Sequence, residues 1–445
     1  MTPERRLMHG YDYSVVFCKM REPLLPTWAV PVVYATGAVS LGLALPRIEA
    51  SLQPEWTSGI SSAVAITMYS SIATGMITLT GIVFSLVFVM VQFSATAYSP
   101  RLVLWMSRDP VVFHAIGVFT ATFLYAICAM AWVDRHGSGN VPFFSGWLVV
   151  VLLLSSVGMF ICLVQRLSHL QIASVLGFTG DFARQIIDLM YPPLGESIVL
   201  SGDSELSLLV VTQRMLYSGP PRAIQSLDVT RLVALARQVD GVIEILSGVG
   251  DTVVESTPLL RVYGGRQAID ERDLKTAIRM GTQRTFEQDP KYSIQLLRDI
   301  AIRALSPAVN DPSTAVQALD QIEDLLFRLG RRCLEIGEVR DGSGHLRLVM
   351  PVPSWDNFLE LALSEIRYYG RESMQVMRRM NALLSDLIDA LPTGRVPALR
   401  SQQKRLHGII ARSFSDVEDH LEASIEDREG LGATRKYRAG NHPGP

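Results

Sequence analysis

The stretch that decides the fold runs from Ile66 to Phe93 and reads ITMYSSIATGMITLTGIVFSLVFVMVQF. It contains no Asp, Glu, Lys or Arg, and it is longer than the roughly 20 apolar residues that cross a hydrocarbon core of about 30 Å. Similar uncharged runs lie on both sides of it, at 24–46, 111–133 and 141–165. The sequence therefore predicts a mainly α-helical membrane protein with four transmembrane helices. The membrane domain covers 24–165, with spans at about 25–45, 66–95, 111–133 and 142–165.

The uncharged run around the second span is too long for a single crossing. As one helix, residues 56–100 would extend about 67 Å at about 1.5 Å per residue, more than twice the hydrocarbon thickness. Residues 56–65 are therefore a loop, a re-entrant segment or an additional length of helix, and all three alternatives stay open.

The arginine and lysine residues beside the predicted spans indicate the orientation of the chain. The N-terminal segment 1–23 carries four of them, and the connection between the second and third spans carries Arg101 and Arg108, whereas the other two connections carry one arginine each. Because basic residues concentrate in cytoplasmic segments, we expect both termini in the cytoplasm, with Arg101 at the cytoplasmic boundary of the membrane. The first run lacks a small-residue cleavage motif, so we expect it to be retained as a span.

One face of the second span carries small and polar residues at spacings of three, four and seven. These residues are Ser71, Thr74, Gly75, Thr78, Gly81, Ser85 and Gln92. One interpretation is helix packing, because small residues four apart let helix backbones approach closely. The other is a pore stripe that lines a hydrated pathway, with hydroxyls and an amide replacing water around a solute. The two interpretations are compatible, since a helix can pack with one edge of a stripe and face a pore with the other.

None of the predicted spans contains a charged residue. Ionisable groups within a bilayer usually mark proton or ion relays, so their absence argues against a proton-coupled carrier or pump. It does not argue against a channel, because hydroxyl-lined and apolar constrictions conduct without charges. His114, near the start of the third span, is interpreted as an interfacial or packed histidine.

Beyond residue 165 the apolar residues become periodic and charged residues are frequent, which is typical of a domain in water. We expect an α+β cytoplasmic domain that begins with a helix over 166–191 extending from the last span. A small β-containing subdomain follows at 192–265, and a mainly helical subdomain at 266–429. The tail, 430–445, has no apolar period and is predicted to be disordered.

The secondary structure of this domain follows from residue patterns. Strands are predicted at 206–212 and 242–246, with a helix between them that begins after Asp228 as N-cap and ends at Val239. A later strand is predicted at 346–352. Further helices are expected at 355–369, 372–391 and 397 to about 427.

The segment GDTVVESTPLLRV, residues 250–262, contains a Gly-Asp turn. It resembles the Gly-Asp-x-Val…Pro-Leu turn of lipoyl-like and barrel-sandwich domains. Such domains carry their cofactor on a lysine, but no lysine lies between Lys19 and Lys275. We therefore expect no bound cofactor and interpret the segment as part of a small assembly domain.

Two Asp-Pro pairs interrupt the helical subdomain. Asp289-Pro290 and Asp311-Pro312 each place an aspartate at a helix N-cap and a proline at the first helical position. This combination satisfies free backbone amides and presets φ. A ligand-binding loop is the alternative for 310–312, because a helix N-terminus can bind an anion. Since Asp311 already occupies this N-terminus, we interpret Asn310, Asp311 and Pro312 as a structural corner.

Motifs for chemistry are absent from the sequence. The four cysteines and eight histidines are scattered, without the spacing of a metal site or a disulfide framework. There is no nucleophile elbow, P-loop or dinucleotide glycine fingerprint. We predict no catalytic residue, no metal and no cofactor. Basic residues of the C-terminal half are interspersed with acidic ones, so nucleic acid is not expected as a partner.

Several segments together resemble one bacterial family of predicted integral-membrane proteins, the domain of unknown function 2254. They are GIVFSLVFVMVQFSATAYSPRL (81–102), GVFTATFLYA (117–126), GDTVVESTPLLRV (250–262) and RTFEQDPKYSIQLLRDIAIRALSPAVNDPSTAVQALD (284–320). The resemblance covers nearly the whole chain. At Ser256 the family pattern tends to have Gly, a difference that concerns only the turn. The resemblance implies an architecture and brings no established reaction or substrate.

From these features we predict an oligomeric channel or passive transporter for ions or small solutes. Its second span would face the centre of a homo-oligomer in the lipid bilayer, and its cytoplasmic domain would hold the assembly together or regulate it. The alternative is a non-conducting membrane scaffold or sensor that binds an unidentified cytoplasmic partner protein.

Overall fold

The structure is a computed structural model of the 445-residue chain. It describes residues 28–52, 60–97, 110–133, 141–168, 172–195, 206 and 208–431. The chain divides into two compact units at residue 171. We call the described residues before this point the membrane unit and those after it the C-terminal unit. The predicted segment 1–23, Arg101 and nearly all of the predicted tail lie outside the described residues.

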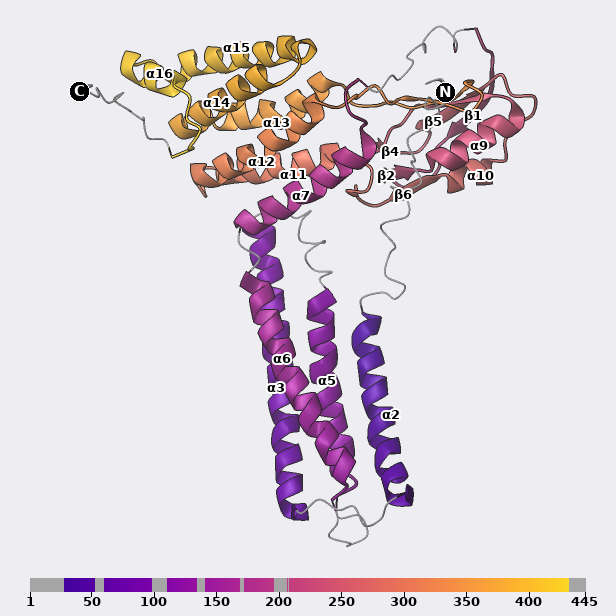
Figure 1. Cartoon of the computed structure of the whole chain (residues 1–445), viewed down its shortest axis with the longest axis vertical. Helices are drawn as coiled ribbons and strands as arrows, with labels where there is room; N and C mark the ends of the chain where they lie inside the picture. Colours follow the sequence, from indigo (N-terminus) through magenta and orange to yellow (C-terminus); the bar gives the residue numbers. More distant parts are fainter. Residues whose placement is uncertain are drawn as a thin grey trace, which may run out of the picture. The chain divides into compact units, whose positions relative to one another are not determined.

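The membrane unit contains the four predicted spans as helices (Figure 1). They are α2 (Ala29–Leu52), α3 (Ser62–Ala97), α5 (Pro110–Met130) and α6 (Phe143–Ser168). Each contains a segment that is long and apolar enough to cross a membrane. Helix α5 packs against the other three, and most of its small residues are buried there. The prediction of a four-helix membrane domain is therefore confirmed.

Helix α2 is longer than the predicted first span. It continues through Pro46 to Leu52 and so includes Arg47 and Glu49, which the sequence had placed in a loop. The Glu49 carboxylate accepts hydrogen bonds from the backbone amides at the start of α6, including that of Phe144 at 3.0 Å. A carboxylate at a helix N-terminus satisfies free amides and complements the helix dipole. This contact holds the last turns of α2 in helical form and leaves a charged residue at the end of the candidate span.

Helix α3 begins at Ser62, which answers part of the question left open for residues 56–65. Residues 62–65 are helical and continuous with the second span, whereas residues 53–59 lie outside the described part of the chain.

The β-containing part of the C-terminal unit has two sheets. The five-stranded sheet has the order β1-β5-β3-β8-β7, and the three-stranded sheet has the order β4-β2-β6. The strands are β1 (Val211–Leu216), β2 (Arg222–Leu227), β3 (Val242–Ile245), β4 (Thr252–Val253), β5 (Pro258–Tyr263), β6 (Ile278–Gly281), β7 (Glu338–Arg340) and β8 (Leu346–Val349). Helices α9 (Val229–Val239) and α10 (Glu271–Thr276) accompany them, and one hydrophobic core joins both sheets to α9.

Several predicted strands differ from those found. The first strand is 211–216 instead of 206–212, because it is Val211 and not the preceding apolar residues that begins the antiparallel pairing with β5. Leu208 and Val210 are 84% and 77% exposed, so the apolar run that suggested the strand is not its buried face. Strands β6, β7 and β8 follow the predicted boundary at 265 in the chain, yet they complete the two sheets.

The helical part of the C-terminal unit surrounds α12. Its helices are α7 (Ile172–Met190), α11 (Pro290–Ala304), α12 (Pro312–Gly330), α13 (Trp355–Tyr369), α14 (Met374–Ala390), α15 (Val396–Ser413) and α16 (Val417–Ser424). Helix α12 packs against α7, α11, α13 and α14. The helix predicted from 397 to 427 is divided into α15 and α16, because Asp416 caps a new helix through its carboxylate. With its sheets and helices, this unit confirms the predicted α+β domain.

Candidate functional site

The stripe of small and polar residues on α3 lies opposite the face that packs against the other membrane helices. Its seven members are exposed in the single chain: Ser71, Thr74, Gly75, Thr78, Gly81, Ser85 and Gln92. The buried residues of α3 are Ala65, Tyr69, Ala73, Met76 and Val83. At about 100° per residue these two sets project from opposite sides of the helix. The described part of the chain therefore leaves this face of α3 largely exposed.

The two glycines of the stripe have no packing role within the described chain. A Cβ atom added at Gly75 or Gly81 would meet no atom within 4 Å. By contrast, a Cβ at Gly117 of α5 would lie 2.6 Å from the ring of Tyr34 on α2, so the packing of the bundle requires this glycine. Glycine lowers helix stability by roughly 1 kcal/mol relative to alanine. Gly75 and Gly81 thus lack an explanation inside the bundle.

Three of the four hydroxyl groups of the stripe donate hydrogen bonds within α3 itself. Ser71, Thr78 and Ser85 each donate to the carbonyl four residues earlier, at 2.8, 2.8 and 3.0 Å. Each hydroxyl oxygen keeps lone pairs that can accept a further hydrogen bond. The stripe can therefore face an apolar neighbour without losing its donor bonds, and it can also offer acceptors to water or a solute.

Two pairs of polar side chains lie in contact inside the bundle. Thr122 Oγ1 lies 2.8 Å from Ser156 Oγ and also donates to the Leu152 carbonyl at 3.2 Å, which joins α5 to α6. The half-buried His114 has its Nδ1 atom 3.2 Å from the Tyr34 hydroxyl, and the two rings pack edge to face. These contacts are packing contacts of the kind predicted for His114.

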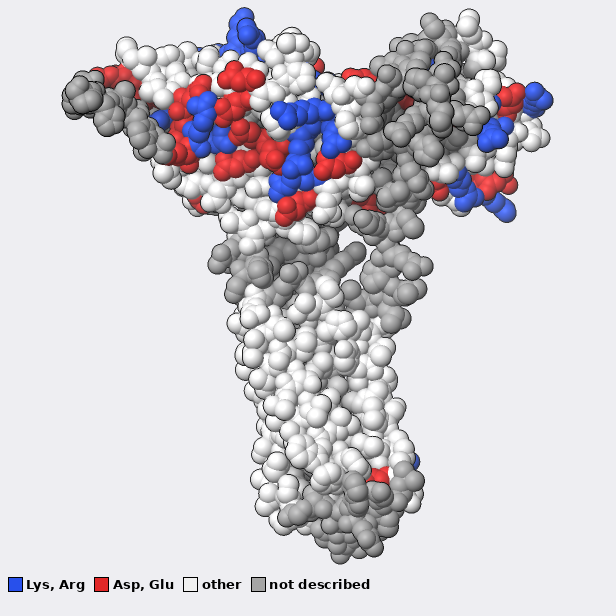
Figure 2. All heavy atoms as spheres, in the orientation of Figure 1, with Lys and Arg blue, Asp and Glu red and all other residues white. Residues whose placement is uncertain are grey.

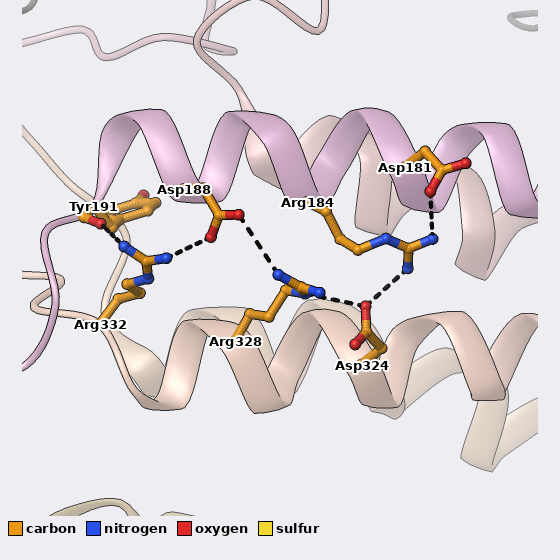
Figure 3. A network of polar contacts seen from close by, with 7 residues as sticks. All are labelled: Asp181, Arg184, Asp188, Tyr191, Asp324, Arg328 and Arg332. Atoms are coloured by element: carbon orange, nitrogen blue, oxygen red, sulfur yellow. Dashed lines mark hydrogen bonds and ion pairs between the residues drawn. The ribbon is translucent and has the colours of Figure 1, made fainter.

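A ladder of charged residues connects α7 to α12 in the C-terminal unit (Figure 3). Its members are Asp181, Arg184, Asp188, Asp324, Arg328 and Arg332. Arg184 donates to both Asp181 and Asp324 at 2.8 Å. Burial lowers the pKa of Arg184, but its hydrogen bonds to these two carboxylates outweigh burial and raise the pKa above its ordinary value. The ladder continues through Arg328 and Arg332, which share Asp188.

A second charged pair, Arg284 and Asp289, is buried at the start of α11. Arg284 Nε donates to Asp289 Oδ2 at 2.8 Å, and Nη1 donates to Gln295. The Asp289 side chain is only 1% exposed, and burial raises its pKa against the opposing effect of Arg284. Asp289 Oδ1 makes no hydrogen bond to a described residue, although the backbone N–H of Tyr292 is close enough to lower the pKa of Asp289. A buried acceptor without a partner costs about 1–3 kcal/mol, so this atom calls for an explanation.

The two Asp-Pro corners differ in what their carboxylates do. Asp311 accepts from the backbone amide of Thr314 at 3.1 Å and from its hydroxyl at 2.6 Å. Asn310 before it has φ +47°, and Pro312 is the first residue of α12. Asp289 also stands at an N-cap position, but its side chain makes no cap hydrogen bond because it pairs with Arg284. Sequence reasoning predicted both N-caps and missed the different partner of Asp289, for which Arg284, five residues earlier, was the only signal.

Nothing in the described residues brings together three His, Cys, Asp or Glu side chains as a metal site would. Arg101, predicted at the cytoplasmic boundary, lies outside the described residues, so its place in the structure is not part of the site.

Comparison with known proteins gives the family. Over 414 residues, which are 89% of this chain and 77% of each relative, the chain is 26% identical to uncharacterised proteins of Mycobacterium bovis (strain ATCC BAA-935 / AF2122/97) and Mycobacterium tuberculosis (strain ATCC 25618 / H37Rv). No solved structure matches the chain. The family described as predicted membrane protein (DUF2254) matches residues 26–386. The chain therefore belongs to this family.

Proposed function

We propose that this member of the DUF2254 family is a homo-oligomer in which copies of α3 face one another and provide a passive pathway for ions or small solutes. The observation that carries the proposal is the position of Gly75 and Gly81 on a surface of α3 that no described residue of the chain covers. In a membrane, small residues let helix backbones approach closely. The stripe is therefore suited to contact between copies of this chain.

A pathway between copies is favoured over one through a single bundle. The bundle interior is filled by an apolar cluster that includes Tyr69, Tyr125 and Val149, and a second cluster contains Phe119 and Leu163. Of the buried hydroxyls within it, those of Thr122 and Ser156 are already paired with each other. The hydroxyl oxygens of the stripe, in contrast, are exposed and keep acceptor lone pairs, as a hydrated pathway requires.

The C-terminal unit acts in this proposal as a cytoplasmic domain for assembly or regulation. On the face shown in Figure 2, charged side chains gather over the C-terminal unit, while the membrane unit shows almost none. Basic residues are frequent before the first membrane helix and after the last one in the sequence. This supports an inner-membrane protein with both termini in the cytoplasm.

The pathway is tested by placing single cysteines on α3. In a background where the four native cysteines are replaced by serine, Thr78→Cys and Ser85→Cys lie on the stripe, whereas Ile77→Cys and Phe84→Cys are exposed beside it. In liposomes, we expect a charged thiol reagent to modify the stripe cysteines and to reduce solute or ion flux. The two control cysteines should stay unmodified, because lipid excludes the reagent.

Unreactive stripe cysteines, or no flux over a range of voltages and salts, would contradict the proposed pathway. The alternative is a non-conducting scaffold or sensor that binds a partner protein through its C-terminal unit. An intact oligomer that conducts nothing and whose stripe is protected would favour this alternative.

A further inference from the structure

The C-terminal unit contains a cavity of about 240 Å³. Its wall is largely apolar and includes Met190, Tyr191, Val249 and Met350. An apolar cavity of about 150 Å³ accepts a benzene molecule. The cavity therefore has room for a molecule of one or two rings, and its wall is of the kind that binds small organic ligands.

Asp289 lines this cavity, and its buried carboxylate is the polar group considered as the ligand-binding group. Arg284 occupies Oδ2, while Oδ1 makes no hydrogen bond in the described part of the chain. The side chain is 1% exposed, so bulk water does not hydrate it freely. Buried acceptors are nearly always hydrogen-bonded in native proteins. Because Oδ1 itself is buried, a donor that enters the cavity would supply the missing bond once the carboxylate turns toward it.

The charges around the cavity decide which kind of donor fits. Asp251 and Lys291 also line it, and Lys291 is close enough to lower the pKa of Asp289. Together with Arg284 and Asp289 they form two positive and two negative groups, so their formal charges cancel. A strongly charged ligand would lose its hydration and gain no net attraction in return. A neutral donor loses less on entering an apolar wall.

We propose that this cavity binds a neutral, largely apolar molecule of one or two rings that donates an N–H or O–H group to Asp289 Oδ1. The site lies entirely in the C-terminal unit, and its occupancy does not depend on whether α3 lines a pathway.

The test uses a pair of probes that differ in one donor. Full-length protein in detergent is dialysed against radiolabelled indole, which carries an N–H group, or against 1-methylindole, which does not. We expect saturable binding of indole and at least about tenfold weaker binding of 1-methylindole, as loss of one hydrogen bond to a charged group predicts. Empty micelles give the background from partition of the probes into detergent.

Substitutions inside and outside the cavity wall show where the probe binds. Val249→Phe fills the cavity and should abolish saturable binding, whereas Val254→Phe, at a 50% exposed position outside the cavity wall, should leave it unchanged. Asp289→Asn should reduce the difference between the two probes. Because Asp289→Asn can disturb folding, the conclusion depends on the comparison of Val249→Phe with Val254→Phe. Equal binding of the two probes, retention of binding by Val249→Phe, or no saturable binding because a water molecule alone satisfies Asp289 would each overturn the proposal.

Discussion

Gly250 combines a left-handed backbone with close approach to the buried Arg284–Asp289 pair. Its φ is +91°, and a Cβ atom here would lie 2.6 Å from Asp289 Oδ2. We expect Gly250→Ala to lower the free energy of unfolding of the C-terminal unit by about 2–4 kcal/mol, because left-handed strain and overpacking add. Urea unfolding followed by the fluorescence of the buried Trp355 measures this change.

The matched control for this substitution is Gly344→Ala. Gly344 has φ +83°, but a Cβ atom there would meet nothing within 4 Å. The control should therefore lose only the about 1–2 kcal/mol of left-handed strain. If Gly250→Ala and Gly344→Ala lower the free energy of unfolding equally, the nearby Arg284–Asp289 pair does not constrain Gly250.

The lowered pKa of Asp341 predicts that the C-terminal unit becomes less stable in acid. A hydrogen bond from Arg347 at 2.7 Å, with backbone amides of Ser343 and His345, lowers its pKa to about 2 against the effect of burial. The unfolded value is about 3.9, so the carboxylate stabilises the fold above about pH 4 and this stabilisation is lost between about pH 4 and pH 2.

The corresponding variant is Asp341→Asn, which cannot titrate. We expect it to lower the free energy of unfolding by about 1.5–3 kcal/mol at pH 7, the range for hydrogen bonds to a charged group, and to remove part of the fall in stability between pH 4 and pH 2. Urea unfolding at a series of pH values tests both. Asp240, which also contacts Arg347 at 3.2 Å, remains in place in wild type and variant alike. A variant as acid-sensitive as the wild type would contradict the assignment.

At the scale of residues, the sequence could predict which residues occupy helix N-caps better than it could predict which groups their side chains bind. Both Asp-Pro pairs stand at helix N-caps as predicted. The carboxylate of Asp311 caps its own helix, whereas that of Asp289 turns to Arg284. The difference arises because the 248–251 turn packs against the Arg284–Asp289 pair through Gly250. That contact joins segments nearly forty residues apart, which local patterns do not record.

At the scale of elements, a substitution at a stripe glycine of α3 should affect assembly of the oligomer without affecting folding of the protomer. Gly75→Leu should leave the thermal stability of the protomer unchanged or raise it, because no described atom lies near its Cβ and leucine favours helix. The same substitution should dissociate the oligomer, since it removes close backbone approach. Native mass spectrometry of the detergent-solubilised protein measures the assembly.

Gly117→Ala is the opposite case on α5. Its Cβ would lie 2.6 Å from the Tyr34 ring, so it should lower the melting temperature of the membrane unit and cost about 1–3 kcal/mol through overpacking. If Gly75→Leu leaves the oligomeric state unaltered, the stripe is not the contact between copies.

Helix α7 is held by its apolar face more than by the charged ladder. Ile187 is fully buried within the C-terminal unit, whereas Asp324 and Arg328 are 39% and 38% exposed. We expect Ile187→Ala to cost about 2–4 kcal/mol and Asp324→Asn less than about 1 kcal/mol. Urea unfolding at low and high salt distinguishes them, because salt screens only the exposed charges. A larger effect of Asp324→Asn at both salt concentrations would reverse this ranking.

Elements with a strong local signal were predictable, and those defined by pairing were not. Helix α13 has the predicted bounds, since Ser354 forms a capping box and its apolar period is regular. Strand β2 was missed altogether, because its residues RAIQSL lack strict alternation and it is fixed by pairing with β4 and β6. Strand β8 pairs in parallel with β3, which lies about a hundred residues earlier. Such long-range pairing leaves no mark on the local sequence.

At the scale of the whole molecule, composition predicted the division into a membrane part and a charged part, because the cost of placing charges in hydrocarbon affects every residue of a span. The stripe on α3 was also visible as a spacing of small residues. Which way it faces depends on how α3 packs against α5 and α6 through residues such as Ala73 and Val83, and that required the structure.

Among the described residues, the hydrophobic clusters of the β-containing part and of the membrane unit share no residue, so the full-length protein should unfold in two steps. The core of the β-containing part is built only from C-terminal residues, and the two membrane clusters only from residues of α2 to α6 and the turns beside them. Urea should unfold the C-terminal unit first, because membrane helices in detergent keep every backbone hydrogen bond within the helix. Trp355 reports on the C-terminal unit and Trp147 on the membrane unit, each in a background where the other tryptophans are phenylalanine. We expect the Trp355 signal to change at lower urea than the Trp147 signal, and Gly250→Ala to shift the first transition alone. Coincident transitions, or a shift of both by that substitution, would mean that the units fold as one.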